Sequence, residues 1–195
     1  APGDPPLAKH VLQLLINAGL PGHMVAEGGL DHGIWTVLRY VYPETNIPVV
    51  PLAWVPTCAA ARQFELGEAL APLRREGVLL IGSGSITHNL RLFMGNQFLL
   101  ESPEVPESLA FREWFASTSA QSDWDALLDY RHRAPHAVAM HPTDEHLLPW
   151  HVAAGAAGRI APPLRLHSGA AYGCIGMDAY AFGPEAQLLR QNLAA

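Results

Sequence analysis

The chain has 195 residues, of which 49% are hydrophobic and 15% charged, and its formal net charge is -6. This length allows one α/β domain with a sizeable buried core. The negative charge gives no reason to expect nucleic acid, which binds a basic face, and no apolar run reaches the ~18 residues of a membrane-spanning helix. Two cysteines, Cys58 and Cys174, lie far apart and form no metal or redox motif, as is typical of thiols in a reduced cytoplasm. We therefore expect a compact cytoplasmic protein without a nucleic-acid or membrane partner.

Several stretches carry apolar residues at helical spacing and are bounded by start or stop signals. The first, residues 7–18, ends at Gly19, and a long one runs from Thr57, its predicted N-cap, to Arg75 before Gly77. The other predicted helices or helical turns cover residues 32–42, 89–93, 107–119, 122–132 with Ser122 as cap, and 144–157 with Thr143 as cap.

The predicted strands are apolar or alternating runs, at residues 47–55, 78–85, 165–169 and 174–182. Strands that alternate with helices predict an α/β fold, here a three-layer α/β/α sandwich around a mostly parallel or mixed central sheet. No internal repeat divides the chain, so residues 1–195 are expected to form a single domain.

His88 follows a predicted strand and a Gly/Ser turn in the sequence GSGSITHNL (82–90). Ligands of open α/β sheets bind beyond the carboxyl ends of the strands, so this position favours a functional site. A histidine that only caps or fills the turn is the alternative. The turn lacks the lysine of a P-loop and the spacing of a dinucleotide fingerprint, and no G-x-S-x-G pattern supports a serine hydrolase.

A second group of candidate residues lies in HPTDEHLLPW (141–150). Imidazole suits iron, zinc or copper, and apolar neighbours would partly bury His146. Asp144 and Glu145 are also ordinary residues for a first helical turn, where they interact with the helix dipole. His32, in LDHGIW (30–35), caps a helix as readily as it serves a site. The remaining histidines without a supporting constellation are treated as surface or structural residues: His10, His23, His132, His136, His151 and His167.

Four blocks of the sequence resemble the class III extradiol ring-cleaving dioxygenases of the DOPA-dioxygenase type, which are related to the β subunit of protocatechuate 4,5-dioxygenase. The blocks are LDHGIWTVLRYVYPETNIPVVPL, ALAPLRREGVLLIGSGSITHNLR, LLDYRHRAPHAVAMHPTDEHLLPW and GAAYGCIGMDAYAF. The resemblance covers nearly the whole chain and corresponds to the C-terminal two-thirds of the family.

The resemblance implies an enzyme that opens a catecholic ring with O2 to a muconic semialdehyde at one non-haem metal. The metal is Fe(II) for catalysis, with zinc in the protein as isolated. His146 matches a metal ligand, with Glu145 as the fallback, and His88 matches the acid/base histidine that also neighbours the metal. His32 matches a catalytic-site histidine that lines the substrate pocket, where Ser85 and Asn89 are expected to bind substrate.

In the family, two further metal ligands are histidines of an N-terminal segment, in G-H-G and S-x-H patterns that this chain lacks. The expectation is therefore a domain without its N-terminal segment, which would be supplied as a protein partner or in a homo-oligomer. A catalytically inactive fragment that serves as an interaction module is the main alternative, and a zinc-dependent hydrolase on the same scaffold is a further one.

Overall fold

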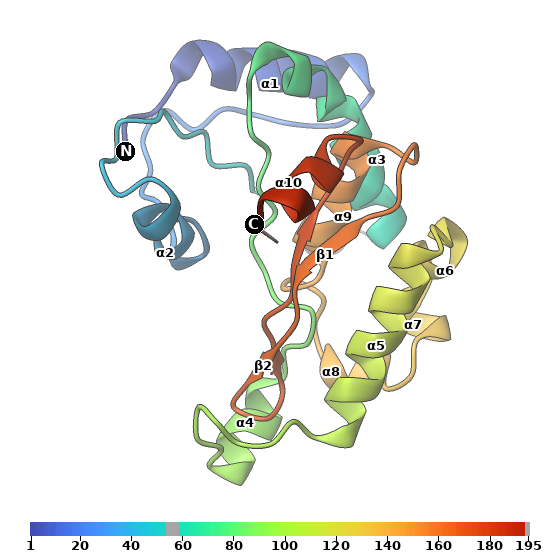
Figure 1. The fold of residues 1–195 in the computed structure, drawn as a ribbon. Coiled ribbons are helices and arrows are strands. Elements are labelled where there is room, and N and C mark those ends of the chain that lie inside the picture. The colour runs from blue at the N-terminus through green and yellow to red at the C-terminus, as the bar shows by residue number, and fades with distance from the viewer. Residues whose placement is uncertain (54–58, 194–195) are drawn as a thin grey trace.

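The computed structural model describes residues 1–53 and 59–193 (Figure 1). The helices are α1 (Pro5–Asn17), α2 (His32–Val41), α3 (Ala60–Leu70), the 3-10 helix η1 (Ala71–Glu76), α4 (Leu90–Asn96), α5 (Pro106–Ala120), α6 (Trp124–Leu128), α7 (Tyr130–Arg133), α8 (Ala137–Met140), α9 (Leu148–Ala157) and α10 (Ala186–Leu193). The strands are β1 (Leu164–His167), β2 (Ala170–Ala171), β3 (Ile175–Gly176) and β4 (Ala179–Ala181). The fold is thus mixed α/β, with helices in the majority.

The main core lies between α5, the short helices α6 to α8, and α9. Phe111 and Phe115 of α5 are fully buried and stack on each other, with ring centroids 6.0 Å apart. Trp150 of α9 meets Phe115 edge-on at 4.8 Å, and Tyr130 meets Phe111 edge-on at 6.3 Å. Aromatic contacts of this kind favour one fixed arrangement of the helices, beyond the effect of area burial.

Glycines allow α3 and α9 to cross at very short range. A Cβ on Gly67 would lie 2.1 Å from the carbonyl oxygen of Val152, and a Cβ on Gly155 would lie 2.0 Å from that of Phe64. No side chain fits such a gap, so these two positions require glycine. A second, smaller core joins α3 and η1 to α1, through residues that include Leu15, Leu70 and Leu73.

The strands form two separate two-stranded antiparallel sheets, β1 with β4 and β2 with β3. The described residues do not form the predicted three-layer sandwich around a central parallel or mixed sheet. Residues 47–53 and 78–85 form neither helix nor strand, and residues 54–55 lie outside the described part of the chain. An extended segment becomes a strand only when a neighbour accepts and donates its backbone hydrogen bonds.

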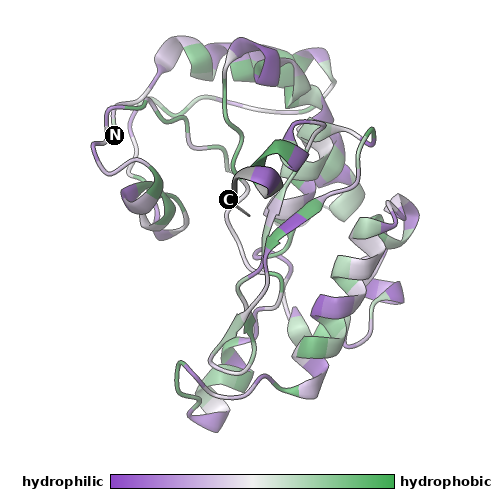
Figure 2. Ribbon diagram, viewed as in Figure 1, coloured by the Kyte–Doolittle hydropathy of each residue, from purple (hydrophilic) through white to green (hydrophobic). Residues whose placement is uncertain are grey.

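The stretch 78–81 nevertheless has the alternation of a strand. Val78 and Leu80 pack against the smaller core, whereas Leu79 and Ile81 are 64% and 49% exposed. In Figure 2, much of the segment that follows η1 is coloured as hydrophobic. The sequence predicted a wholly apolar central strand here, but two of its side chains are exposed and the segment pairs with no described strand.

Two helix starts also differ from the prediction. Asp123, and not Ser122, caps α6, because its Oδ1 accepts a hydrogen bond from the Ala126 amide at 3.0 Å. The helix predicted over 144–157 begins only at Leu148, since the Thr143 hydroxyl donates to the Glu145 carboxylate at 2.7 Å instead of capping. The helix predicted from Thr57 is found from Ala60 onwards and ends, through η1, at Gly77 (φ 78°); Thr57 itself lies outside the described residues.

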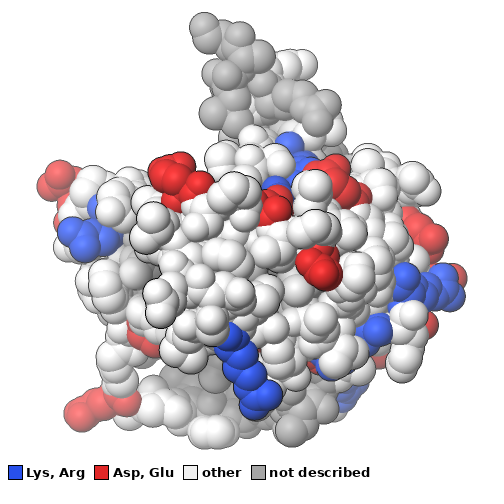
Figure 3. All heavy atoms as spheres, turned by 90° about the horizontal axis from the view of Figure 1, so that it is seen from below, with Lys and Arg blue, Asp and Glu red and all other residues white. Residues whose placement is uncertain are grey.

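On the face drawn in Figure 3, Lys and Arg side chains are dispersed, and several of them lie beside Asp or Glu. No described helix combines the length and apolar character that crossing a membrane requires.

Two buried histidines are part of the core. His151 is 0% exposed, and its Nε2 lies 3.1 Å from the Leu127 carbonyl oxygen, to which it can donate. Burial lowers the pKa of His151 to about 4, below the ordinary 6.5. His141 is equally buried, and its pKa is also lowered to about 4.

We expect the free energy of unfolding to fall as the pH drops from 6.5 towards 4. In this range the two histidines are protonated in the unfolded chain but stay neutral in the folded protein. Each such histidine contributes about 1.4 kcal/mol per pH unit over this window. His151→Gln keeps a donor near the Leu127 carbonyl and removes one titrating group, so its stability should depend less steeply on pH. Urea unfolding at pH 6.0 and 5.0 measures this, with the exposed His23→Gln as control. Equal slopes in the two variants would contradict the assignment.

Candidate active site

The candidate site is built where the segment Gly82–Asn89 lies against the start of α9. The Ser85 amide donates to the His146 carbonyl oxygen at 2.7 Å. A Cβ on Gly84 would lie 2.0 Å from this oxygen, and a Cβ on Gly82 would lie 2.2 Å from the carbonyl oxygen of Pro149. The close approach of two backbone segments of the chain thus explains the glycines of the GSGS turn, and phosphate binding is not needed to explain them.

This contact brings His88 and His146 together from two distant parts of the sequence. Their imidazole rings are stacked, with centroids 3.4 Å apart and planes 15° from parallel. The His88 amide donates to the Met140 carbonyl oxygen at 3.0 Å, which fixes the backbone from which the ring projects. Both side chains are partly buried, and the two histidines singled out from the sequence converge on one place.

The surroundings favour neutral imidazoles. Burial lowers the pKa of His88, and the neighbouring His146 lowers it further, while Glu145 opposes both effects. Burial also lowers the pKa of His146, with Glu145 raising it and His32 lowering it. Burial alone would raise the pKa of Glu145, but the Thr143 hydroxyl and the two nearby histidines leave it below its ordinary value. At neutral pH the site therefore holds two uncharged imidazoles beside one ionised carboxylate.

His32 is the first residue of α2 and is exposed. Asp31 caps this helix by accepting from the Ile34 amide at 3.2 Å, so a histidine cap is not needed. A Cβ on Gly33 would lie 3.6 Å from the Ser83 hydroxyl, which places the start of α2 beside the GSGS turn. His32 is near enough to His146 to lower its pKa. All three predicted site histidines thus belong to one region.

Ser85 and Asn89 flank His88 and have structural partners. The Ser85 hydroxyl lies 2.8 Å from the carbonyl oxygens of both Thr87 and Gly176. The Asn89 side chain accepts from the Leu92 amide as the N-cap of α4, and donates to the Ala139 carbonyl oxygen at 2.7 Å. Both side chains stabilise the segment that carries His88, and their contact with substrate stays a prediction.

Sequence reasoning did not single out His141 as a part of the site. Its Nε2 lies 2.7 Å from the Ile86 carbonyl oxygen, so a hydrogen bond to the buried ring stabilises the segment that carries His88 from the side of the core. The signal was its place in the run AVAMH, where apolar neighbours predict burial, five residues before His146. Its role is support, because no part of the side chain reaches the surface.

The described residues fit one part of a metal centre. The Nδ1 atom of His146 is buried without a hydrogen-bond partner, and at 3.6 Å the Glu145 carboxylate is too far to provide one. A buried imidazole nitrogen of this kind is a suitable ligand for iron or zinc. No cluster of three or more His, Cys, Asp or Glu residues that could hold a metal ion occurs among the described residues. Among the described residues, His146, with His88 beside it, could therefore supply only part of a metal site.

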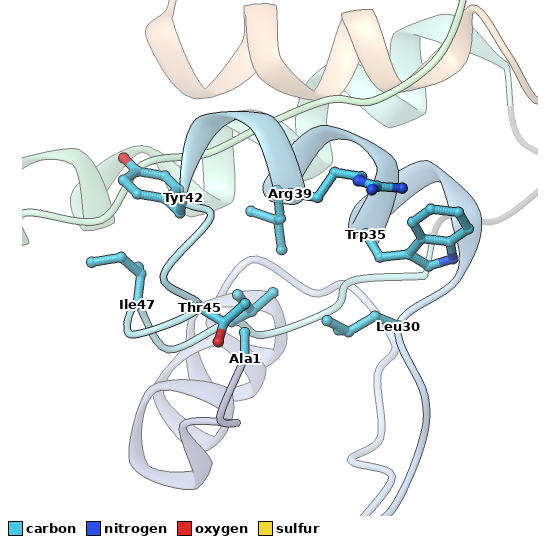
Figure 4. Close-up of a pocket in the computed structure, with 9 residues that line it drawn as sticks. Ala1, Leu30, Trp35, Arg39, Tyr42, Thr45 and Ile47 are labelled. Carbon is cyan, nitrogen blue, oxygen red and sulfur yellow. The ribbon is translucent and has the colours of Figure 1, made fainter.

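A separate cavity of about 270 Å³ lies between α2 and residues 45–49 (Figure 4). Trp35 and Arg39 of α2, and Tyr42 just after this helix, face Leu30 and Ile47 across it. None of the candidate site residues lines it, so it is not the place where the imidazoles meet.

Comparisons with known proteins agree with the geometry. A family model described as "Catalytic LigB subunit of aromatic ring-opening dioxygenase" matches residues 1–183. The "4,5-DOPA dioxygenase extradiol" of Mirabilis jalapa is 35% identical over 193 residues, which are 96% of this chain and 69% of the relative. The protein of the same name from Beta vulgaris is 35% identical over 183 residues, 93% of this chain and 67% of the relative.

The crystal structure of an uncharacterized Escherichia coli K12 protein, JW3007, superposes with a TM-score of 0.79 at 33% sequence identity. The match covers 94% of this chain and 74% of that chain. The chain thus spans about two-thirds to three-quarters of the length of these relatives.

Gly84→Ala should destabilise the protein by about 1–3 kcal/mol or more, because the new Cβ overlaps the His146 carbonyl oxygen and forces the two backbones apart. Urea unfolding measures the loss. Gly95→Ala is the matched control, since a Cβ there meets nothing within 4 Å, and alanine favours the helix α4. A Gly84→Ala variant as stable as Gly95→Ala would show that the close contact is not needed.

Proposed function

The chain belongs to the family of the catalytic LigB subunit of aromatic ring-opening dioxygenases, and we propose that it opens a catechol ring with O2 in the extradiol manner. The observation that carries the proposal is the stacked pair His88 and His146 at the glycine contact. Relatives named 4,5-DOPA dioxygenase extradiol favour 3,4-dihydroxyphenylalanine or a similar catecholic acid as substrate.

His146 is proposed to bind a non-haem metal through an imidazole nitrogen, with His88 as a close neighbour. Fe(II) is the proposed metal for catalysis, and zinc is a second metal that this donor type accepts. When bound, such a metal orients the catechol and O2 and stabilises negative charge on the oxygens. A site with three protein ligands needs donors beyond those described, and we propose that an N-terminal segment or a second copy of the chain supplies them.

His88 is proposed as the general acid and base. Its lowered pKa keeps the ring neutral at physiological pH, so it can accept a proton from a catechol hydroxyl. The same proton is returned as the ring opens, and both atoms of O2 end in the semialdehyde product, so no external reductant is needed. His32, at the exposed start of α2, is placed to contact the substrate. Since catechols are small soluble molecules, a cytoplasmic location fits this activity.

An inactive fragment of the same fold is the less favoured alternative. The family model is that of a catalytic subunit, and the chain retains both imidazoles of the pair. A hydrolase is less favoured because none of the reported relatives is named as one.

The direct test is to assay the protein in its full natural length with Fe(II) and 3,4-dihydroxyphenylalanine. Uptake of one O2 per ring, with the appearance of a yellow semialdehyde, is the expected result. Metal incorporation without any catechol-dependent O2 uptake would contradict the proposed activity.

His88→Ala should lower turnover by roughly 10²–10⁴-fold, the usual contribution of a general acid–base group, while the iron content stays nearly constant. Steady-state O2 uptake and metal analysis measure the two quantities. His23→Ala, at an exposed position, is the control and should leave both unchanged. Undiminished turnover in His88→Ala would assign the proton transfer to another group.

His146→Ala should instead lose the metal, because the variant lacks a ligand. Its iron content after reconstitution should fall well below that of His88→Ala, and activity should fall with it. Full iron occupancy in His146→Ala would show that His146 is not a ligand.

A further inference from the structure

We propose that Thr87, through Ser108, is a positioning residue for His88 during ring opening; this inference rests on the function proposed above. Thr87 immediately precedes His88 and is 0% exposed. Its hydroxyl lies 3.1 Å from the hydroxyl of Ser108, which is also fully buried on α5. The residue before the proposed base is thus tied to a helix of the main core.

The direction of the hydrogen bonds is set by a carboxylate. Ser108 donates to Oε1 of Glu104 at 2.6 Å, and an ionised carboxylate can only accept. A serine hydroxyl has one hydrogen, so Ser108 has none left for Thr87 and must accept from it. The series of hydrogen bonds therefore runs from Thr87 to Ser108 to Glu104, and it allows a single orientation of the threonine hydroxyl.

Glu104, at the far end of this series of hydrogen bonds, is held in place by buried charged side chains. The second oxygen of Glu104 accepts from Nη1 of Arg112 at 2.5 Å, and Arg112 donates through Nε to Asp178 at 2.5 Å. The side chains of Arg112 and Asp178 are 3% and 0% exposed. Charge-assisted hydrogen bonds that are removed from water hold their geometry strongly, because losing one partner leaves an uncompensated buried charge.

The same network holds the backbone of the His88 segment. The Ile86 amide donates to the Gly176 carbonyl oxygen at 3.1 Å, and the Gly176 amide donates to the Thr87 carbonyl oxygen at 3.0 Å. Gly176 has no room for a side chain, since a Cβ would lie 2.8 Å from the Thr87 hydroxyl and 2.9 Å from Cδ of Arg112. Asp178 follows two residues later, so one buried cluster fixes both the backbone and the side chain of Thr87.

Positioning follows from this arrangement because Thr87 points inward while the next side chain, His88, reaches the site. The rings of His88 and His146 are only 3.4 Å apart, so a small rotation of the peptide between residues 87 and 88 displaces the imidazole relative to its partner. Displacement of a reacting group by about 1 Å can lower a rate by about 100-fold. The Thr87 hydroxyl therefore controls the placement of the base without touching substrate.

The test uses two variants that each remove one hydroxyl, Thr87→Val and Ser108→Ala, in the full-length protein. Both should lower kcat for 3,4-dihydroxyphenylalanine on the order of 10- to 100-fold, with KM and iron content unchanged. Thr87→Ser restores the hydroxyl and should return kcat to within about twofold of the parent. The double variant Thr87→Val with Ser108→Ala should be no worse than the poorer single variant, because both break one chain.

Ser119→Ala is the matched control. Ser119 is a second fully buried serine of α5, but its hydroxyl donates to the Phe115 carbonyl oxygen at 2.7 Å within its own helix. Its replacement should leave kcat unchanged. If Thr87→Val fails to fold, Ser108→Ala on a different element carries the test by itself.

A readout that does not depend on activity is the Cε1–Hε1 NMR signal of His88 in the metal-free protein at one fixed pH. The signal should move in Thr87→Val and Ser108→Ala, and stay in place in Ser119→Ala and Thr87→Ser. An unmoved signal with an unchanged kcat overturns the positioning role, even if His88→Ala is inactive. A moved signal in a protein without ring-opening activity supports the positioning role and contradicts only the proposed function.

Discussion

The candidate site depends on the contact between two backbones, that of the GSGS turn and that of the residues before and within the first turn of α9. The hydrogen bond from the Ser85 amide to the His146 carbonyl oxygen is 2.7 Å long, and Gly84 lies directly over that oxygen. Any larger residue at position 84 would separate the two segments. Because His146 belongs to one segment and His88 follows the other by three residues, the contact also determines how close their rings come.

Burial then sets the chemistry that the two rings can perform. Partial removal from water lowers the pKa of both His88 and His146, so that each ring has a free lone pair at neutral pH. A neutral imidazole can bind a metal or accept a proton, whereas a protonated one can do neither. His141 supports this arrangement from the core, where a fully buried ring holds the Ile86 carbonyl oxygen. The half-buried rings of His88 and His146 thus lie next to a fully buried supporting histidine.

The sequence predicted those parts of the molecule that depend on local pattern. Apolar spacing located α1, α2 and α5 within a few residues. Gly77 was correctly predicted to end the helical segment formed by α3 and η1. Convergence of His88 and His146 was predicted from their place in two specific motifs. In each case the signal lies within a short stretch of residues.

The features that escaped prediction depend on partners far away in the sequence. Residues 78–81 alternate as a strand does, but pairing requires a neighbour that the described chain does not place beside them. Thr143 has a residue type that caps helices, yet its hydroxyl is used by Glu145. The ion network of Arg112 links residues 66 positions apart, and nothing in the local sequence around Arg112 or Asp178 indicates the other.

We propose that a catalytic metal binds in the region where His88 and His146 meet. The most direct test is the anomalous difference map of a crystal of the full-length protein grown with zinc(II). We expect one strong peak about 2.0–2.1 Å from a ring nitrogen of His146, with the His88 ring beside it. A fully occupied zinc site elsewhere in the protein, with the His146 ring free of metal, would show that the metal site is not where His88 and His146 meet.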